Sequence, residues 1–386
     1  DPFADPPDPF ADPAPIDSAS AAVGSSFDPS AVDPLPPPRG LEIHGRINGT
    51  VAFSREEDTV EQLKHTSFGL SAADLYAAYY PTRWFGALAE LELEQDLGDG
   101  DRFLALEVDL LAVELRPFSN DRLLLRLGHQ PVTFGLERRF YAPPRNELAN
   151  RPAAFRRVYP GTYSDTGAFL WARQSTGFLR SELELELSLT RGLTGPDRDD
   201  KRAVFSKDNN SAAQWAGRLG WTVVDLDPTR RGAQGIEAAL PTSLRFAFGA
   251  SFLNGEYDRD ARRRVRFYGF DAELRLGGLL VRGELVVSEV ESEVPDARTR
   301  RGTGTYVLAA YHWRLEEFLV DELYVAFRYG RADRDQRVSE TLDVERYHVG
   351  LGWVPHPGFL AKVGYEWTKG RGDPGRVVYL ELGFSF

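Results

Sequence analysis

Six arginines gather in one segment that carries almost no opposite charge. Between residues 131 and 164 the only acidic residues are Glu137 and Glu147, so this segment has a local charge of +4 in a chain whose net charge is −12. A guanidinium stays protonated at any pH that a protein meets, and its planar fork of donors fits carboxylate and phosphate groups. The cluster therefore predicts a place that attracts small anions. Its members are Arg138, Arg139, Arg145, Arg151, Arg156 and Arg157.

Other residues that could support chemistry lack the spacing that it needs. Cysteine is absent, which excludes thiolate catalysis, disulfides and cysteine-bound metals. The six histidines (44, 65, 129, 312, 348 and 356) show no metal-ligand spacing, and no serine, histidine and carboxylate converge on one face. The net negative charge argues against nucleic acid as the main partner. We therefore expect no enzyme, no cofactor and no metal site.

Alternating segments surround the arginine cluster and must position it. Leu183, Leu185 and Leu187 interleave with Glu182, Glu184 and Glu186, and a period of two indicates a strand with one apolar and one polar face. Sixteen segments of this kind follow one another from Leu41 to the end of the chain. They are expected near 41–54, 71–80, 83–96, 102–116, 122–130, 165–173, 178–190, 212–223, 243–255, 264–276, 279–291, 303–315, 319–331, 343–354, 358–369 and 376–386.

The connections and the last strand indicate a membrane barrel. No run of about 18 apolar residues is present, which excludes a helical membrane span, but strands of about ten alternating residues can cross a bilayer. Short connections alternate with longer, charged ones, as in outer-membrane barrels, with one exception at 227–242. The last strand ends on Phe386, which resembles the terminal aromatic residue that marks such barrels for assembly. A soluble β-sandwich repeat protein is the alternative that this alternation leaves open.

Within such a barrel, the polar strand faces place charged side chains in the lumen. Opposed basic and acidic walls would set a transverse field across a pore, whereas pairing between them would only brace the wall. The long loop, residues 131–164, has no strand pattern, and a connection of this length is usually functional. We expect it to form the constriction. The basic wall is predicted as Arg122, Arg126, Arg275, Arg282, Arg328 and Lys362, and the acidic wall as Glu90, Glu92, Glu94, Glu182, Glu184 and Glu186.

Residues 1–40 differ in composition from the rest of the chain. They hold 11 of the 25 prolines and seven aspartates against the single basic residue Arg39. Such a segment cannot pack a core and is expected to be polyproline-like or disordered. It opens with DPFADPP and DPFADPA, in which Phe3 and Phe10 are candidate anchors for docking onto a protein partner. The alternative is a linker. Because the chain begins at Asp1 and lacks methionine, we expect that a leader has been removed.

A longer motif resembles a known family. The run LLAVELRPFSNDRLLLRLGHQPVTFGLERRF, followed by Arg156, Arg157 and SDTGAFLWA, is similar to the core of the phosphate-selective porins, over about residues 104–195. The motif itself is Pro131, Phe134, Gly135, Leu136, Glu137 and Arg138. The resemblance implies a trimer of sixteen-stranded barrels that passes anions, with phosphate held by basic side chains at the constriction. In the general porins the corresponding loop folds into the lumen. The family often uses lysines there and a coiled coil at its N-terminus, whereas this chain has arginines and a proline-rich segment.

The sequence therefore predicts an all-β protein, a 16-stranded antiparallel transmembrane β-barrel of residues 41–386 with a proline- and aspartate-rich N-terminal extension. The predicted function is an outer-membrane porin, a passive diffusion channel that prefers small anions such as phosphate. Because the number of strands is even, the first strand begins and the last strand ends on the same side of the membrane. For outer-membrane barrels this side is the periplasm, so we expect residues 1–40 there. The expected partners are bacterial outer-membrane lipid, small anions, two further copies in a homotrimer, and a possible protein partner of residues 1–40. The alternative function is a barrel that anchors or sleeves such a partner.

Overall fold

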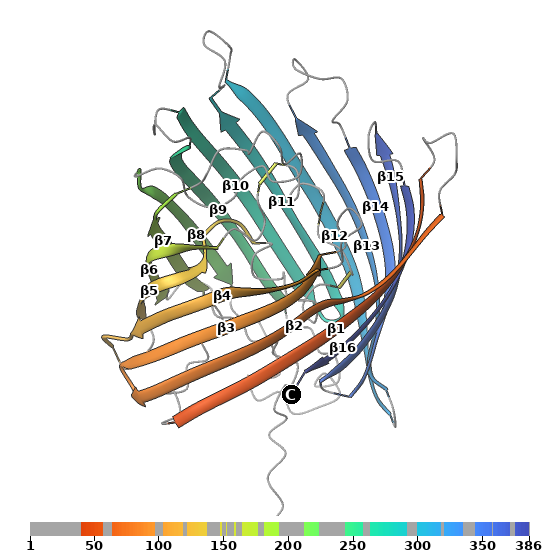
Figure 1. Ribbon diagram of the computed structural model, residues 1–386, viewed down its shortest axis with the longest axis horizontal. Coiled ribbons are helices and arrows are strands. Elements are labelled where there is room, and N and C mark those ends of the chain that lie inside the picture. Colours follow the sequence, from red (N-terminus) through yellow and green to blue (C-terminus); the bar gives the residue numbers. More distant parts are fainter. Residues whose placement is uncertain are drawn as a thin grey trace, which may run out of the picture.

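Sixteen antiparallel strands close into a barrel in the computed structural model (Figure 1). The structure describes residues 40–56, 64–96, 103–118, 122–136, 147–148, 152, 158–159, 164–176, 181–192, 212–223, 244–257, 263–291, 299–317, 320–334, 344–356, 358–370 and 375–385. Within these ranges no helix is long and apolar enough to cross a membrane.

The strands are long, as a membrane-sized barrel requires, and most of them are tilted relative to the barrel axis. They are β1 (Gly40–Glu56), β2 (Lys64–Thr82), β3 (Phe85–Asp96), β4 (Phe103–Leu115), β5 (Leu123–Pro131), β6 (Ser164–Ser175), β7 (Ser181–Thr190), β8 (Gln214–Val223), β9 (Leu244–Tyr257), β10 (Arg263–Leu276), β11 (Leu279–Val290), β12 (Arg300–Glu317), β13 (Val320–Arg334), β14 (Val344–His356), β15 (Phe359–Gly370) and β16 (Gly375–Ser385).

Each strand pairs with the next along the chain, and β1 pairs with β16 to close the ring. In this closing pair Arg46 lies opposite Ser385, and Glu56 lies opposite Gly375. Closure removes the two free edges that an open sheet would present. The predicted fold class, an all-β antiparallel barrel of sixteen strands, is confirmed.

Burial alternates along the strands and separates an outer from an inner face. On β7, Leu185 and Leu189 are exposed while Glu186 between them is buried. The last strand repeats the pattern: Leu380 is exposed and Glu381 is only 3% exposed. In a closed barrel the exposed apolar row must be the outer face, because the inner side chains crowd one another and the loop that enters the barrel. The predicted orientation of the alternating residues is therefore correct for these strands.

The two ends of the barrel differ in the length of their connections. At one end β10 and β11 are joined by the two glycines 277 and 278, and Gly277 adopts a φ of 54°, which favours glycine. At the other end β5 stops at Pro131 and β6 begins only at Ser164. The start of β1 and the end of β16 lie at the end of the short turns, as expected for an even number of strands.

The predicted strand bounds agree with the observed ones to within three residues, except at the start of β2. The sequence pattern placed that start at residue 71, whereas the strand begins at Lys64. The stretch KHTS opens it, and four polar residues in a row conceal the alternation. Its place is fixed instead by pairing with β1, where Lys64 lies opposite Arg55, and by a register shift between Asn48 and Gly49.

Candidate functional site

The long loop packs against the inner wall of the barrel. Val132, Phe134, Leu148, Val158 and Tyr159 are each less than 5% exposed and belong to one apolar cluster with inner-face residues of the wall. The wall residues of this cluster include Val265, Phe267, Val286, Tyr306, Leu308 and Ala310, from β10, β11 and β12. Where the loop residues pack on it, the lumen-facing side of these strands is apolar, whereas Asp271, Glu273 and Glu284 on the same face are charged.

Three aromatic rings join the loop to β10. Phe134 stacks on Tyr159 with ring centroids 4.3 Å apart, so the beginning and the end of the loop meet at this point. Phe267 on β10 meets both rings edge-on, with centroid distances of 6.2 Å to Phe134 and 5.2 Å to Tyr159. Aromatic pairs at these distances favour tilted or offset arrangements, so the three rings form a well-defined anchor.

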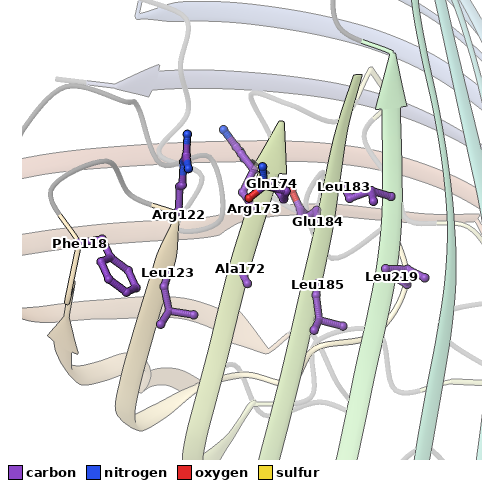
Figure 2. A pocket seen from close by; sticks show the side chains of 10 residues that line it. All are labelled: Phe118, Arg122, Leu123, Ala172, Arg173, Gln174, Leu183, Glu184, Leu185 and Leu219. Atoms are coloured by element: carbon purple, nitrogen blue, oxygen red, sulfur yellow. Dashed lines mark ion pairs between the residues drawn. The ribbon is translucent and has the colours of Figure 1, made fainter. Parts of the chain in front are cut away.

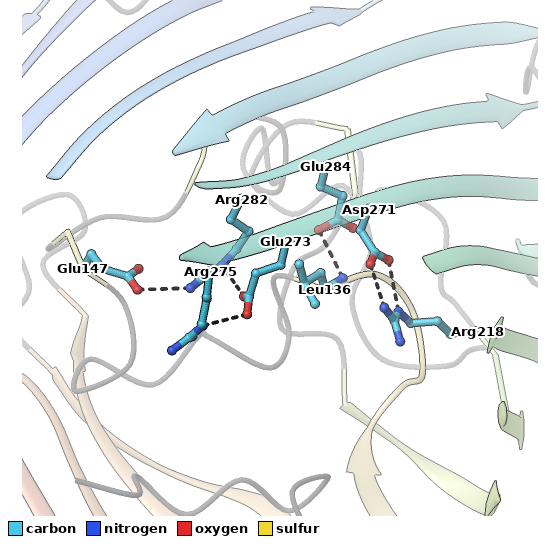
Figure 3. Close-up of polar contacts among 8 residues, drawn as sticks. All are labelled: Leu136, Glu147, Arg218, Asp271, Glu273, Arg275, Arg282 and Glu284. Carbon is cyan, nitrogen blue, oxygen red and sulfur yellow. Dashed lines mark hydrogen bonds and ion pairs between the residues drawn. The ribbon is translucent and has the colours of Figure 1, made fainter. Parts of the chain in front are cut away.

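Polar contacts fix the same loop at two further points (Figure 3). The backbone N–H of Leu136 donates to Oε2 of Glu284 at 3.1 Å. The backbone N–H of Gly135 donates to Oγ of Ser251 at 3.0 Å. Gly135 has a φ of 70°, and a Cβ at this position would collide with the carboxylate of Glu284. Further along, Nη2 of Arg282 donates to Oε1 of Glu147 at 3.0 Å. The loop is thus held by β9 and β11 as well as β10.

The wall behind the loop is braced by an ion pair that spans three strands. Arg218 on β8 binds both carboxylate oxygens of Asp271 on β10, at 3.0 and 2.6 Å. The guanidinium crosses β9 at Gly249, where an added Cβ would lie 2.7 Å from Cζ of Arg218 and from Oδ2 of Asp271. Only glycine leaves room for this bidentate contact.

Two residues of the predicted basic wall share one carboxylate on β10. Nε of Arg275 lies 2.8 Å from Oε1 of Glu273, and Nε of Arg282 lies 3.2 Å from Oε2 of the same residue. Arg282 also contacts Glu147 of the long loop, as described above. Both arginines lie on the inner face, as predicted, and Arg275 keeps 44% of its side chain exposed.

On β5 the basic wall meets a second buried carboxylate. Glu114 is 0% exposed and lies between two guanidiniums, with Oε1 2.5 Å from Nε of Arg116 and Oε2 2.8 Å from Nε of Arg126. The hydroxyl of Tyr80 also donates to Glu114, at 3.2 Å. Arg126, a predicted wall residue, is therefore part of a compact network on the inner face.

Two further basic wall residues, Arg328 and Lys362, lie on β13 and β15. Nζ of Lys362 lies 3.2 Å from Oε1 of Glu381, and both side chains are nearly inaccessible to solvent. Nη2 of Arg328 lies 3.4 Å from Nδ1 of His348. These contacts show that the basic residues have partners on the wall and contribute to bracing it. Their predicted role in a transverse field stays a prediction.

The described side chains of the predicted acidic wall also lie on the inner face. Glu92 and Glu186 are buried, and Glu184 lies 3.5 Å from Nη1 of Arg218. In a ring of sixteen strands β3 is opposite β11, and β7 is opposite β15, so the acidic strands face two of the basic ones. β5, which carries Arg126 and directly follows Arg122, lies between β3 and β7. Glu90 and Glu182 are half-buried, and the side chain of Glu94 lies outside the described residues.

A cavity of about 450 Å³ lies along the ends of β5, β6 and β7 (Figure 2). Arg122 of the predicted basic wall is exposed and lines it, next to Arg173 and Glu184. Arg173 lies 3.6 Å from Glu182 and 4.0 Å from Glu184, with its Cζ 4.7 Å from the ring centroid of Trp171. Leu123, Ala172, Leu185 and Leu219 form the apolar side of the cavity.

The other predicted functional residues lie outside the part of the chain that the structure describes. They are the six loop arginines Arg138, Arg139, Arg145, Arg151, Arg156 and Arg157, the tail residues Phe3 and Phe10, and the terminal Phe386. Among the described residues, no group of histidine and acidic side chains could hold a metal ion.

Several residues of the site were not singled out from the sequence. Glu114, Asp271, Glu273 and Glu284 accept the contacts that hold the wall arginines and the loop. Each of these residues stands between two apolar neighbours in its strand, and this alternation could have predicted that its side chain faces the lumen. The apolar part of the inner face of β10 to β12, around Phe267, Val286 and Tyr306, gave no such signal, because apolar residues there occupy both faces.

Known structures share this architecture, although comparisons of the sequence with family models and curated proteins give no match. No protein-family model matches the chain, and no curated protein matches it. An anion-selective porin from Comamonas acidovorans matches with a TM-score of 0.57 and 11% identity, over 90% of this chain and 99% of that one. OmpF of Salmonella typhi, in a complex with daunomycin, gives a TM-score of 0.57 and 12% identity, over 90% and 97%.

The outer-membrane channel DcaP of Acinetobacter baumannii matches with a TM-score of 0.52 and 10% identity, over 92% of this chain and 100% of that one. The chain has the porin fold. At identities this low the likeness establishes the fold and says nothing about a solute. The structural matches therefore support a likeness to porins in general, and they do not test the predicted resemblance to the phosphate-selective porins.

Proposed function

We propose that the protein is a passive diffusion channel of the bacterial outer membrane that prefers small anions. The observation that carries this proposal is the packing of the long loop on the inner wall. Phe134, Leu148 and Tyr159 are buried there among lumen-facing residues, so these residues of the loop lie inside the barrel. A loop inside a barrel narrows the passage and sets which solutes can enter it.

Four arginines of the loop are close in sequence to its buried residues. In the sequence Arg138 and Arg139 follow the anchored Leu136 by two and three residues, and Arg156 and Arg157 directly precede the buried Val158. A residue spans at most about 3.6 Å of chain, and on this ground we propose that these four arginines line the constriction. Permanently charged guanidiniums at a constriction attract anions and repel cations.

We further propose small oxyanions, phosphate among them, as the physiological solutes, and a homotrimer as the assembly. The resemblance of the segment around Pro131 and Arg138 to the phosphate-selective porins supports both. The anion-selective porin with the same fold is consistent with an anion preference. Arginine forks bind phosphate through two contacts, which favours a slow passage of phosphate relative to chloride.

Conductance of the purified full-length chain in a planar bilayer tests the proposal. Under a salt gradient we expect open channels whose reversal potential has the sign of an anion-selective pore. Phosphate added at constant chloride should lower the chloride current as it occupies the arginines. A barrel that stays closed, and opens only after residues 1–40 are removed, would instead support a sleeve for a partner of the tail.

Replacing Arg138, Arg139, Arg156 and Arg157 together by serine tests whether the loop arginines or the wall arginines set the ion selectivity. Removing four positive charges from a constriction should lower the anion-to-cation permeability ratio on the order of tenfold, which corresponds to about 1.4 kcal/mol. The stability of the barrel should change little, because the strands carry it.

The matched control replaces four arginines of the outer face, Arg264, Arg301, Arg331 and Arg376, by serine. This variant loses the same charge without touching the lumen, so its reversal potential should stay that of the unmodified channel. If both quadruple variants keep the original selectivity, the loop does not select ions. The wall arginines would then be the remaining candidates.

A further inference from the structure

An apolar patch lies on the lumen-facing side of β2, β3 and β4. It forms a buried cluster of its own, in which every member is at most 6% exposed. Leu75 and Tyr79, which alternate with its members on β2, are exposed on the outer face. The cluster therefore faces the lumen, and we call it the lumen patch. Its members are Tyr76, Ala78, Tyr80, Leu88, Leu110 and Ala112.

The described part of the long loop lies on the other side of the barrel. In the ring of sixteen strands β2, β3 and β4 are opposite β10, β11 and β12, on which the loop residues pack. Within the described chain, the cluster of the lumen patch contains no residue from a connection. Apolar side chains gain stability from contacts that remove them from water, and a lumen is otherwise open to water. The lumen patch therefore needs a covering layer of its own.

The lumen patch presents flat aromatic rings. A Cβ at Gly86 on β3 would collide with the Tyr80 ring, so this ring crosses the neighbouring strand where glycine leaves room. Its hydroxyl donates to Oε1 of Glu114 on β4 at 3.2 Å, which fixes the orientation of the ring. His44 on β1 extends the aromatic surface, with its ring centroid 6.3 Å from that of Tyr76 and an interplanar angle of 28°.

The chain joins the barrel at the edge of the lumen patch. Gly40, the first residue of β1, lies opposite Tyr80. Directly before it, residues 34–38 read PLPPP. Five residues of polyproline II extend roughly 15 Å, at about 3.1 Å per residue. The path along β2 from Tyr80 to Tyr76 is roughly 13 Å, at about 3.3 Å per residue. A reversal of the chain just before Gly40 would therefore lay residues 34–38 along the patch.

We propose that residues 34–38 fold back into the lumen as a polyproline II segment and cover the lumen patch. Proline-rich segments bind aromatic-lined grooves in this conformation, because their stiff backbone loses little entropy on docking. Proline also has no N–H group, so four of these five residues bring no donor that burial would leave unsatisfied. Leu35 adds an apolar side chain. This inference rests on the fold and on the place where the tail joins the barrel, and not on ion selectivity.

Thiol labelling of the full-length chain in lipid vesicles tests this inference, because the native sequence has no cysteine. The probe residue is Ala112→Cys in the lumen patch, and the reagent is a water-soluble methanethiosulfonate. The variant P34S, P36S, P37S, P38S keeps the length of the tail and makes this part of it flexible. We expect the probe to react on the order of tenfold faster in this variant than with the native tail, since a weakened cover opens more often.

Two matched controls separate the cover from general loosening. Ala310→Cys is a probe on the inner face of β12, in the cluster that contains the loop residues, and its reaction rate should be the same with either tail. The variant P6S, P7S, P9S, P13S removes four prolines at the far end of the tail and should leave Ala112→Cys protected. Unchanged protection in the P34S, P36S, P37S, P38S variant would overturn the proposal, because another segment would then be the cover. So would faster reaction at both probes, or equal acceleration by the two tail variants.

Disulfide trapping shows whose tail covers the patch. The double variant P37C, A78C places one cysteine in the proline segment and the other between the two tyrosines of β2. On oxidation we expect a disulfide within one chain, seen as a denatured protein of monomer size without free thiols. A disulfide-linked dimer would identify the tail of a second copy as the occupant and overturn the assignment to the same chain. Two free thiols after oxidation would show that the segment lies elsewhere, and this result would overturn the proposal as well.

Discussion

Glu114 is a buried carboxylate that lies between two guanidiniums. It is 0% exposed and lies within 2.8 Å of the guanidiniums of both Arg116 and Arg126. Replacing it by glutamine leaves two inner-face arginines without their shared carboxylate. We expect Glu114→Gln to lower the free energy of unfolding by about 3–5 kcal/mol, since breaking a buried pair on one side leaves charge uncompensated. Urea titration of the barrel in lipid vesicles, followed by tryptophan fluorescence, measures this change.

Glu182 provides the matched control for that experiment. It is half-buried, and its carboxylate lies 3.6 Å from Nε of Arg173, so Glu182→Gln should cost less than about 1 kcal/mol. Equal losses in the two variants would show that the network around Glu114 is no stronger than a surface ion pair.

Individual wall residues were predictable from the sequence, but their partners were only partly so. Arg126 and Glu114 lie directly opposite each other on strands joined by a short connection. The register of this hairpin is therefore enough to predict that they pair. Arg218 and Asp271 are separated by a whole strand, and their contact depends on the missing side chain of Gly249. Alternation within a strand holds no information about such a contact.

The long loop is the element on which the proposed selectivity depends, and Phe134 is its main anchor. Phe134→Ala removes the ring that contacts both Tyr159 and Phe267. We expect the loop to leave the wall part of the time, so that single-channel current becomes noisier and the mean conductance changes. Global stability should fall by less than the roughly 3–5 kcal/mol of a buried phenylalanine, because the loop can detach locally.

Phe327→Ala on β13 is the control, because this phenylalanine is exposed on the outer face. Its channels should have the noise and conductance of the unmodified protein. Identical traces from the two variants would contradict a role of the loop anchor in the pore.

At the level of elements, the sequence was most informative where the two strand faces differ in chemistry. On β7 leucine and glutamate alternate, and both the strand and its orientation follow directly. On β12 Tyr306, Leu308 and Ala310 face inward while Val307 and Tyr311 face outward, so both faces are apolar and the pattern cannot tell them apart. The inward set is explained only by the loop that packs on it. The arginines of the loop were predicted from their charge, whereas the apolar Phe134 was named as part of the motif and not as an anchor.

At the scale of the whole molecule, the charge is divided between the barrel and the tail. Seven aspartates and one arginine give residues 1–40 a net charge of −6, half of the total. Because β1 begins beside the end of β16, at the end with the short turns, this segment joins the barrel at the rim of one pore mouth. Forty residues of polyproline could extend roughly 120 Å, at about 3.1 Å per residue, so the tail is long enough to enter the lumen.

We therefore predict that the tail competes with permeating anions for the basic residues of the pore. Removal of residues 1–40 should raise the single-channel conductance at low salt, and the gain should shrink at 1 M salt as screening shortens the range of the attraction to about 3 Å. A full-length variant with all seven tail aspartates changed to asparagine separates charge from length: it should conduct like the truncated barrel. If truncation leaves conductance unchanged at every salt concentration, the tail is a linker outside the pore. If the asparagine variant instead conducts like the unmodified chain while truncation opens the channel, the tail acts by its bulk and the DPF units, with Phe3 and Phe10, become the groups to mutate.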